Sequence, residues 1–397
     1  MIDDKDDRVS IPFQLINNLI VVELEINESE PLTFIVDSRA GRNIITSLYD
    51  KEITLNNVAK VRLAGLGKGN SLIAYQSLDN KIEIGDRIEG NDIEILLLEE
   101  ELLSLSSFMG IPIHGILGYD FFSSFAVEVN YRRNLLRIYD HNEFVEKFET
   151  LPEHRKWYTL PIKIDDKKAY LNAKYKPQMG QEFKPLQLLL DTGASNSFSL
   201  YEVADEYISV PNDNVNAILG TGLSGFITGQ LGRVHTMRLG EFEFVNPIVA
   251  FPDSQSVRRA IKLDDRKGSI GGDIFRRFKV IFHYENEKLY VRKNGDYDDE
   301  FHFNASGLEV SAPYPELRYY VVSYVREGSP GDSIGIKEGD VLLQVNNKSV
   351  TELTLNELFN YLQNKKGDRV YLKIKRDSLN HQMMLEMGDE LKPLNIN

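Results

Sequence analysis

Two distant stretches of the sequence share one pattern, an apolar run that ends in an aspartate and a small hydroxylated residue. Residues 188–195 read Leu-Leu-Leu-Asp-Thr-Gly-Ala-Ser, and residues 34–41 read Phe-Ile-Val-Asp-Ser-Arg-Ala-Gly. Each apolar run is typical of a buried strand. A carboxylate at the end of such a strand is costly to bury unless partners surround it, so both aspartates are candidate functional residues.

A glycine-containing segment follows each of these stretches at a matching distance. Residues 115–122 read Gly-Ile-Leu-Gly-Tyr-Asp-Phe-Phe, and residues 268–275 read Gly-Ser-Ile-Gly-Gly-Asp-Ile-Phe. The aspartates are 83 residues apart in the first copy (37 to 120) and 82 in the second (191 to 273). This spacing predicts two copies of one unit, and period-two alternation such as Ile11–Leu15 and Leu160–Ile164 predicts that the unit is rich in β-strands.

The chain divides into four parts on this basis. Residues 1–10 are expected to form a polar leader, 11–150 a first lobe, 151–297 a second lobe and 301–390 a third unit. Short helices are expected near 113–122 and 273–278, where Asp120 and Asp273 would cap a helix rather than take part in chemistry. In the third unit, leucines and a phenylalanine spaced along 354–363 predict an amphipathic helix, and 370–374 a closing strand.

Composition excludes several classes of function. The net charge of −14 argues against a nucleic-acid partner. The absence of cysteine excludes disulfides and thiolate metal sites, and the seven histidines lack metal-ligand spacing, so neither a metal nor a cofactor is expected. No apolar run is long enough for a membrane span. The polar N-terminus is no signal peptide, and we expect an export signal to have been removed.

The repeated Asp-Thr/Ser motif resembles the active-site motif of the pepsin and retropepsin aspartic proteases. The resemblance implies a mostly β fold of two pseudo-twofold-related, retropepsin-like β-barrel lobes, with Asp37 and Asp191 as the catalytic dyad. It further implies that Ser38 and Thr192 support the two catalytic loops. The other supporting residues that it implies are Gly193, Ser195, Gly118 and Gly271.

Each lobe also has a glycine-rich stretch where these proteases carry a mobile flap over the cleft. The candidates are Gly65 and Gly67 in the first lobe and Gly220 and Gly222 in the second. The alternative is an ordinary surface hairpin. A phosphate-binding loop is excluded, because neither stretch has the required spacing or an opening helix.

The third unit resembles a bacterial PDZ domain, an α+β fold. Gly-Ser-Pro at 328–330 and Gly-Ile-Lys-Glu-Gly-Asp-Val-Leu-Leu at 335–343 carry the resemblance. It implies a peptide ligand bound as an added strand. Residues 312–319, where the carboxylate-binding loop is expected, do not read Gly-Leu-Gly-Phe, so packing of this unit against the protease lobes is the alternative.

The function implied is an aspartic endopeptidase that acts on an extended peptide or protein substrate. Two facing carboxylates would share one proton and activate a water molecule. Arg39, however, stands where the family has glycine and could crowd the loop or pair with Asp37. The alternative is therefore a catalytically impaired peptide- or protein-binding protein on the same scaffold. The resemblance also implies an exported bacterial protein, periplasmic or surface-associated.

Overall fold

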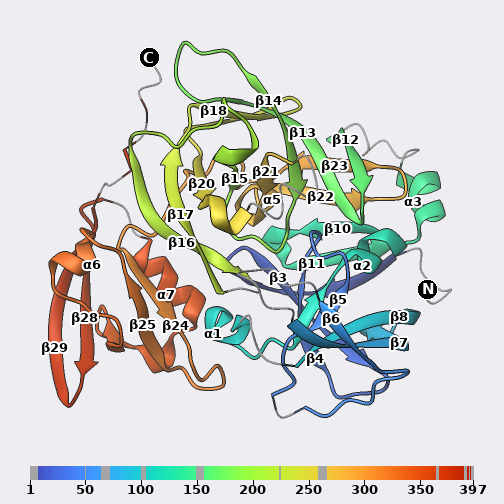
Figure 1. Ribbon diagram of the computed structural model, residues 1–397, viewed down its shortest axis with the longest axis horizontal. Helices are drawn as coiled ribbons and strands as arrows, with labels where there is room; N and C mark the ends of the chain where they lie inside the picture. Colours follow the sequence, from blue (N-terminus) through green and yellow to red (C-terminus); the bar gives the residue numbers. More distant parts are fainter. Residues whose placement is uncertain are drawn as a thin grey trace.

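A computed structural model describes residues 8–49, 51–63, 72–99, 104–148, 156–222, 225–257, 266–363, 366–388, 391–392 and 394. These residues form mostly β-structure, in two barrel-like lobes followed by a smaller α+β domain (Figure 1). The predicted fold class is therefore confirmed. The first lobe is drawn in blue and cyan, the second in green and yellow, and the C-terminal domain in orange and red.

The first lobe is built on an eight-stranded sheet that curls on itself. Its strand order is β2-β3-β4-β9-β5-β8-β7-β6, and an additional pairing of β3 with β7 brings distant parts of the sheet together. The strands are β2 (Gln14–Ile16), β3 (Leu19–Ile26), β4 (Leu32–Val36), β5 (Asn43–Ile45), β6 (Ala59–Leu63), β7 (Leu72–Ile84), β8 (Ile88–Leu98) and β9 (Gly115–Leu117).

The second lobe repeats the strand pairing that matters for the site. In the first lobe β9 runs parallel to β4 and antiparallel to β5, and in the second β21 runs parallel to β14 and antiparallel to β15. The strands of this lobe are β13 (Lys168–Lys176), β14 (Lys184–Leu190), β15 (Phe198–Leu200), β16 (Asn214–Gly222), β17 (Gly225–Arg233), β18 (Thr236–Leu239), β19 (Phe242–Val245), β20 (Ile248–Pro252) and β21 (Gly268–Ile270).

Six strands, three from each lobe, lie side by side in a larger sheet that also contains the strands of the second lobe. Strand β10 pairs antiparallel with β22, so that Val129 lies opposite Val280 at the boundary between the lobes. Lys279 of β22 reaches across to the buried Glu128 of β10, with 2.7 Å between Nζ and Oε1. The strands are β1 (Arg8–Pro12), β11 (Leu135–Tyr139), β10 (Ala126–Asn130), β22 (Phe278–His283), β23 (Lys288–Lys293) and β12 (Tyr158–Asp165).

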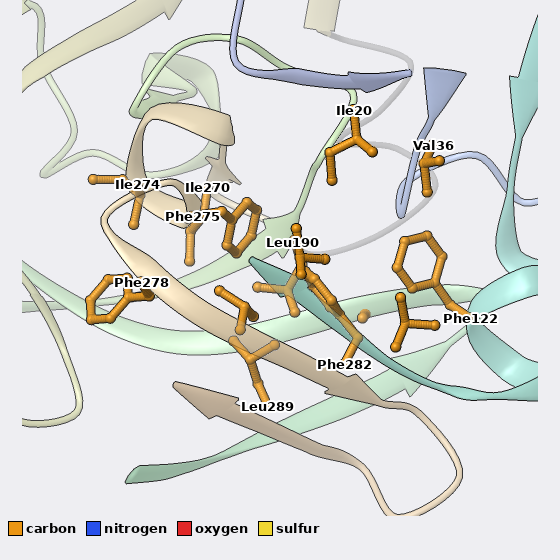
Figure 2. Close-up of a cluster of buried hydrophobic side chains, with 14 of the residues drawn as sticks. Ile20, Val36, Phe122, Leu190, Ile270, Ile274, Phe275, Phe278, Phe282 and Leu289 are labelled. Carbon is orange, nitrogen blue, oxygen red and sulfur yellow. The ribbon is translucent and has the colours of Figure 1, made fainter. Parts of the chain in front are cut away.

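The largest apolar cluster among the described residues extends beneath both lobes. Figure 2 shows Val36 and Phe122 of the first lobe close to Leu190, Ile270 and Phe282 of the second, and all five are almost fully buried. Val36 and Leu190 end β4 and β14, so each is followed directly by one of the repeated aspartates. The core therefore fixes the point at which each aspartate loop leaves its strand.

Matching hairpin turns open the two lobes. Asn17 and Asn18 join β2 to β3 with φ of 49° and 63°, and Asp166 and Lys167 join β12 to β13 with φ of 45° and 59°. Consecutive left-handed residues are the mark of a type I′ turn, which suits the twist of a two-residue hairpin, and Asn and Asp tolerate this conformation better than most residues.

The helices of the lobes are short, as the sequence predicts. Those with both ends among the described residues are α1 (Leu105–Met109), α2 (Tyr119–Ser124), α3 (His141–Phe148) and α5 (Gly272–Phe275), with 3-10 turns η1 (Tyr131–Arg133) and η3 (Glu202–Ala204). The expected capping by Asp120 and Asp273 is wrong, because Gly118 and Gly271 occupy the N-cap positions. Asp120 instead accepts a hydrogen bond from Asn43 Nδ2 (2.9 Å), and Asp273 pairs with Arg276 Nε (2.8 Å).

The C-terminal domain has its own sheet and its own buried core. Its elements are β24 (Leu308–Ser311), β25 (Tyr320–Val325), α6 (Pro330–Ser333), β26 (Val341–Val345), β27 (Lys348–Ser349), η4 (Val350–Glu352), α7 (Leu355–Leu362), β28 (Arg369–Arg376) and β29 (Leu379–Glu386). Helix α7 confirms the predicted amphipathic helix. It begins with a capping box in which the Thr354 hydroxyl and the Glu357 carboxylate bond each other's backbone N–H. Strand β29 was not predicted.

Candidate active site

The two repeated aspartates occupy equivalent places in the two lobes. The Asp37 N–H donates to Leu117 O and the Asp191 N–H donates to Ile270 O, both at 2.9 Å. The Asp37 carboxyl group lies against the loop of the other lobe, since a Cβ atom placed on Gly193 would come within 2.5 Å of Asp37 Cγ. A side chain at residue 193 would therefore displace this carboxyl group, which explains why glycine is needed there.

Ser38 and Thr192 tie the two loops together reciprocally. The Ser38 N–H donates to Thr192 Oγ1 (2.9 Å), and the Thr192 N–H donates to Ser38 Oγ (3.0 Å). Each hydroxyl then donates to the strand of the opposite lobe, Ser38 Oγ to Leu190 O (2.9 Å) and Thr192 Oγ1 to Val36 O (2.8 Å). Both residues are fully buried, so every hydrogen bond in this network spans the lobe boundary without competition from solvent.

Replacing Thr192 by valine is expected to lower the free energy of unfolding by about 2–4 kcal/mol. Valine keeps the shape of the side chain but removes two buried hydrogen bonds and leaves the Ser38 N–H without its acceptor. Thr192→Ser is the matched control, because it keeps the hydroxyl and loses only a methyl group, at a cost of about 1 kcal/mol. Urea unfolding measures both values, and equal losses would contradict the role given to the hydroxyl.

The predicted supporting glycines lie where backbones meet closely. A Cβ atom on Gly118 would lie 2.5 Å from Ala40 O, and one on Gly271 would lie 2.1 Å from Asn196 O. Both distances are shorter than any non-bonded contact of a real side chain, so β9 and β21 can lie beside the aspartate loops only with glycine at these positions. Ser195 contributes its backbone, since its carbonyl oxygen accepts from Asn18 Nδ2 at 3.0 Å.

Arg39 crosses from the first loop to the aspartate of the second. Its backbone N–H donates to Asp37 Oδ1 (2.8 Å), while its Nη1 atom lies 3.5 Å from Asp191 Oδ2. The Arg39 side chain is 48% exposed, whereas that of Asp191 is 5% exposed. The side chain thus pairs with Asp191 rather than with Asp37, the partner that the sequence suggested. The guanidinium group therefore bridges the two aspartate loops.

The environment of Asp37 favours its protonated form. Burial, and then the negative charge of Asp191, raise the pKa of Asp37 to about 6, although the Arg39 guanidinium and the backbone N–H groups of Arg39 and Ala40 act in the opposite direction. One proton on Asp37 beside a charged Asp191 is the state in which two close carboxyl groups avoid mutual repulsion.

The unsubstituted chain is expected to lose free energy of unfolding between pH 4 and pH 8 because Asp37 loses its proton. In Asp37→Asn this loss should be smaller by about 2 kcal/mol. Since the folded-state pKa of Asp37 is raised to about 6, its contribution to stability is complete below the unfolded pKa and is lost as the pH rises through 6. Asparagine has no proton to lose. Urea unfolding at both pH values measures the effect, with the exposed Asp213→Asn as control, and an unchanged difference would contradict the raised pKa.

Sequence reasoning missed two residues of the site. Tyr284 is buried, and its pKa is raised chiefly by burial and further by the charges of Asp37 and Asp191. Its ring stacks on Phe122, with 5.4 Å between centroids. Tyr284 follows β22 and belongs to no motif, so the sequence held no signal for it. Asn18 was recognised only as a turn residue, and its bond to the Ser195 carbonyl depends on how the lobes meet.

The flap candidates have different outcomes. Gly65 and Gly67 lie outside the described residues. Gly220 and Gly222 lie in β16, whose hairpin with β17 contains a register shift between Ile218 and Gly220. Gly220 has φ of 149° and lines a cavity together with Ser195 and the C-terminal domain. The two glycines are therefore on a hairpin beside the loop that follows Asp191, and a flap function is still only a prediction.

Three groups of metal-ligand type converge away from Asp37 and Asp191, although the sequence showed no such spacing. The ligand atoms of His141, His283 and Glu285 lie within 4.8 Å of one another. They come from the start of α3 and the end of β22, elements that only the shared sheet brings together. His141 Nδ1 lies 3.3 Å from Glu285 Oε2, and a protonated His141 would form an ion pair there.

The C-terminal domain packs directly against the first lobe. Ala312, which follows β24, donates its N–H to Ser107 O in α1 (2.8 Å). A Cβ atom on Gly110 would lie 2.7 Å from Leu355 Cβ, so the end of α1 touches the start of α7. Residue 312, in the stretch where a carboxylate-binding loop was expected, is therefore bonded to a protease lobe.

Two family models match parts of the chain. Residues 178–274 match the aspartyl protease family model, and residues 321–376 match the PDZ domain model. Two similar solved structures are basic 7S globulin from soybean (9% identity, TM-score 0.43, 74% of this chain and 97% of that chain) and conglutin gamma from lupine seeds (12%, 0.41, 73% and 96%). No curated protein matches the chain.

No helix among the described residues is long and apolar enough to cross a membrane. The aspartyl protease match contains Asp191 and Gly271, whereas Asp37 and Arg39 precede it. The chain therefore joins an aspartyl protease domain to a C-terminal PDZ domain.

Proposed function

We propose that the chain is an aspartic endopeptidase in which Asp37 and Asp191 form the catalytic dyad. The observation that carries the proposal is the network between Ser38 and Thr192, which holds the two aspartate loops together across the lobe boundary. A raised pKa on Asp37 and a guanidinium beside Asp191 support different roles for the two carboxyl groups.

In the proposed reaction Asp191 is the base and Asp37 the acid. Asp191 takes a proton from a water molecule as the water oxygen bonds to the scissile carbonyl carbon, and Asp37 gives its proton to the carbonyl oxygen. The tetrahedral intermediate collapses when the leaving nitrogen receives the proton held by Asp191 and the C–N bond breaks. Asp37 regains its proton from the intermediate, so the dyad returns to its starting state.

A second function is favoured by one observation, the ion pair between Arg39 and Asp191. If this guanidinium occupies the position of the attacking water, the chain binds peptides in the cleft without cleaving them. The PDZ domain supports peptide binding in either case, because PDZ domains commonly bind extended peptide segments.

Incubation of the full chain with casein, an unstructured protein, tests the proposal. We expect cleavage at mildly acid pH that a pepstatin-like transition-state analogue blocks, because such an analogue occupies the position of the tetrahedral intermediate. Resistance of casein from acid to neutral pH would overturn the endopeptidase and leave the binding protein.

A further inference from the structure

The PDZ domain is fixed to the second lobe by two arginines. Arg277, which is almost fully buried, donates to the carbonyl oxygens of Tyr297 (3.2 Å) and Glu300 (3.4 Å) in the segment between the domains. Arg233 donates to Phe301 O (3.2 Å) and, in the C-terminal tail, to Leu391 O (3.0 Å). The segment leading into the PDZ domain is therefore bonded to the lobe along its length rather than free to swing.

The PDZ domain also contacts the first lobe, so it bridges both lobes at one side of the molecule. Besides the contacts of α1, the Asn17 N–H donates to Asn356 Oδ1 of α7 at 3.3 Å. In Figure 1 the PDZ domain lies beside both lobes, with α1 next to α7 and with β16 and β17 on the side of the second lobe that faces it.

A cavity of about 480 Å³ lies between these parts. One wall is α7, with Asn356, Phe359 and Asn360, and the linker residues 301–304 continue it. The opposite wall contains residues 195–197 of the catalytic loop and residues 217–220 of the β16–β17 hairpin. Ser195 is four residues after Asp191 in the sequence. The cavity is therefore lined in part by the loop that follows the proposed catalytic base, Asp191.

The lining of the cavity is suited to an uncharged peptide. Its side-chain amides can bond a peptide backbone, and its aromatic and aliphatic groups can bury an apolar side chain. The charges on the lining have protein partners, since Asp273 pairs with Arg276 (2.8 Å between Oδ1 and Nε). Glu309 accepts from Asn304 Nδ2 at 3.4 Å, and burial raises its pKa. Arg326 also lines the cavity, donates to Asn304 O (3.2 Å) and acts electrostatically on Glu309. A charged substrate segment would therefore have to compete with the protein partners that these charged side chains already have.

We propose that this cavity, which residues of the PDZ domain and of both lobes line, is a substrate subsite. It binds an extended, uncharged segment of the substrate with a large apolar residue, to one side of the scissile bond. The PDZ domain is then a wall of the protease cleft. The inference rests on the proposed function only in taking the ligand to be a peptide bound in that cleft.

Asn360 offers a direct test, because it is exposed on α7 and lines the cavity. We expect Asn360→Trp to fill the cavity and to weaken peptide binding about tenfold or more. The matched control is Asn380→Trp on β29, an exposed position outside the cavity, which we expect to bind as the unsubstituted chain does. The probes are two fluorescent, extended peptides that are otherwise uncharged and differ only in one central residue, leucine or aspartate.

Binding is measured by fluorescence anisotropy on the full chain with both Asp37→Asn and Asp191→Asn in place, so that no cleavage is needed. The leucine peptide should bind more tightly than the aspartate peptide, and Asn360→Trp should remove that difference. If Asn360→Trp binds both peptides as Asn380→Trp does, or if neither peptide binds the full chain, the subsite is overturned. Intact casein in the separate cleavage assay would contradict the endopeptidase alone.

Discussion

Replacing Asp191 by asparagine is expected to lower kcat for casein cleavage about a thousandfold. The asparagine amide keeps nearly the same shape but cannot accept the proton of the attacking water, and general base catalysis contributes roughly this factor. Asp191 is almost fully buried, so a carboxylate on the protein surface cannot reach its position and act as the base in its place.

The rate of appearance of new amino termini measures this effect, with Asp213→Asn as the matched control. Asp213 is exposed in a loop before β16, and its amidation should leave kcat unchanged. Asp37→Asn should lower kcat by a similar factor, because the amide cannot give a proton to the carbonyl oxygen. An Asp191→Asn protein with full activity would show that Asp191 is no catalytic residue.

Replacing Arg39 by glycine is expected to raise kcat/KM at pH 7 about fivefold, the gain in the protonated fraction of Asp37 when its pKa rises by about one unit from 6. The Arg39 guanidinium lowers the pKa of Asp37, so its removal lets Asp37 keep its proton to higher pH. The alkaline limb of the pH profile, near pH 6 in the unsubstituted chain, should move upward by about one pH unit. This is a small shift for the removal of a nearby opposite charge, because the Arg39 side chain is half exposed.

Arg39→Lys separates charge from space. Lysine keeps a positive charge at the site, so the alkaline limb should stay near its original pH. If Arg39→Gly moves the limb and Arg39→Lys does not, the charge controls the dyad. An unchanged profile in Arg39→Gly would contradict the electrostatic coupling, whereas activity that appears only in Arg39→Gly would support the binding function of the natural chain.

Local sequence was sufficient for those parts of the fold that depend on short-range chemistry. The apolar run before Asp191 predicted a buried strand, and the spacing of leucines and a phenylalanine along 354–363 predicted α7. The close backbone approach at Gly118 and Gly271 was also predictable, because a glycine at such a position indicates that two backbones pack too closely for a side chain. Each of these features is encoded within a few neighbouring residues.

Contacts between distant segments could not be predicted in the same way. The sequence suggested that Arg39 might reach Asp37, two positions away, but the side chain points across the lobe boundary to Asp191. The contact between Asn18 and Ser195 and the meeting of His141 with His283 depend on how whole sheets join. No pattern along the chain specifies how these sheets are placed relative to one another.

The six strands shared between the lobes have a consequence for how such a chain can be divided. Either lobe produced alone would expose the backbone hydrogen-bonding edge of β10 or β22 that is paired in the full chain. Exposed strand edges of this kind promote self-association. Co-synthesised halves, in contrast, have a ready-made template in each other, so split-protein reconstitution should succeed where isolated expression gives inclusion bodies.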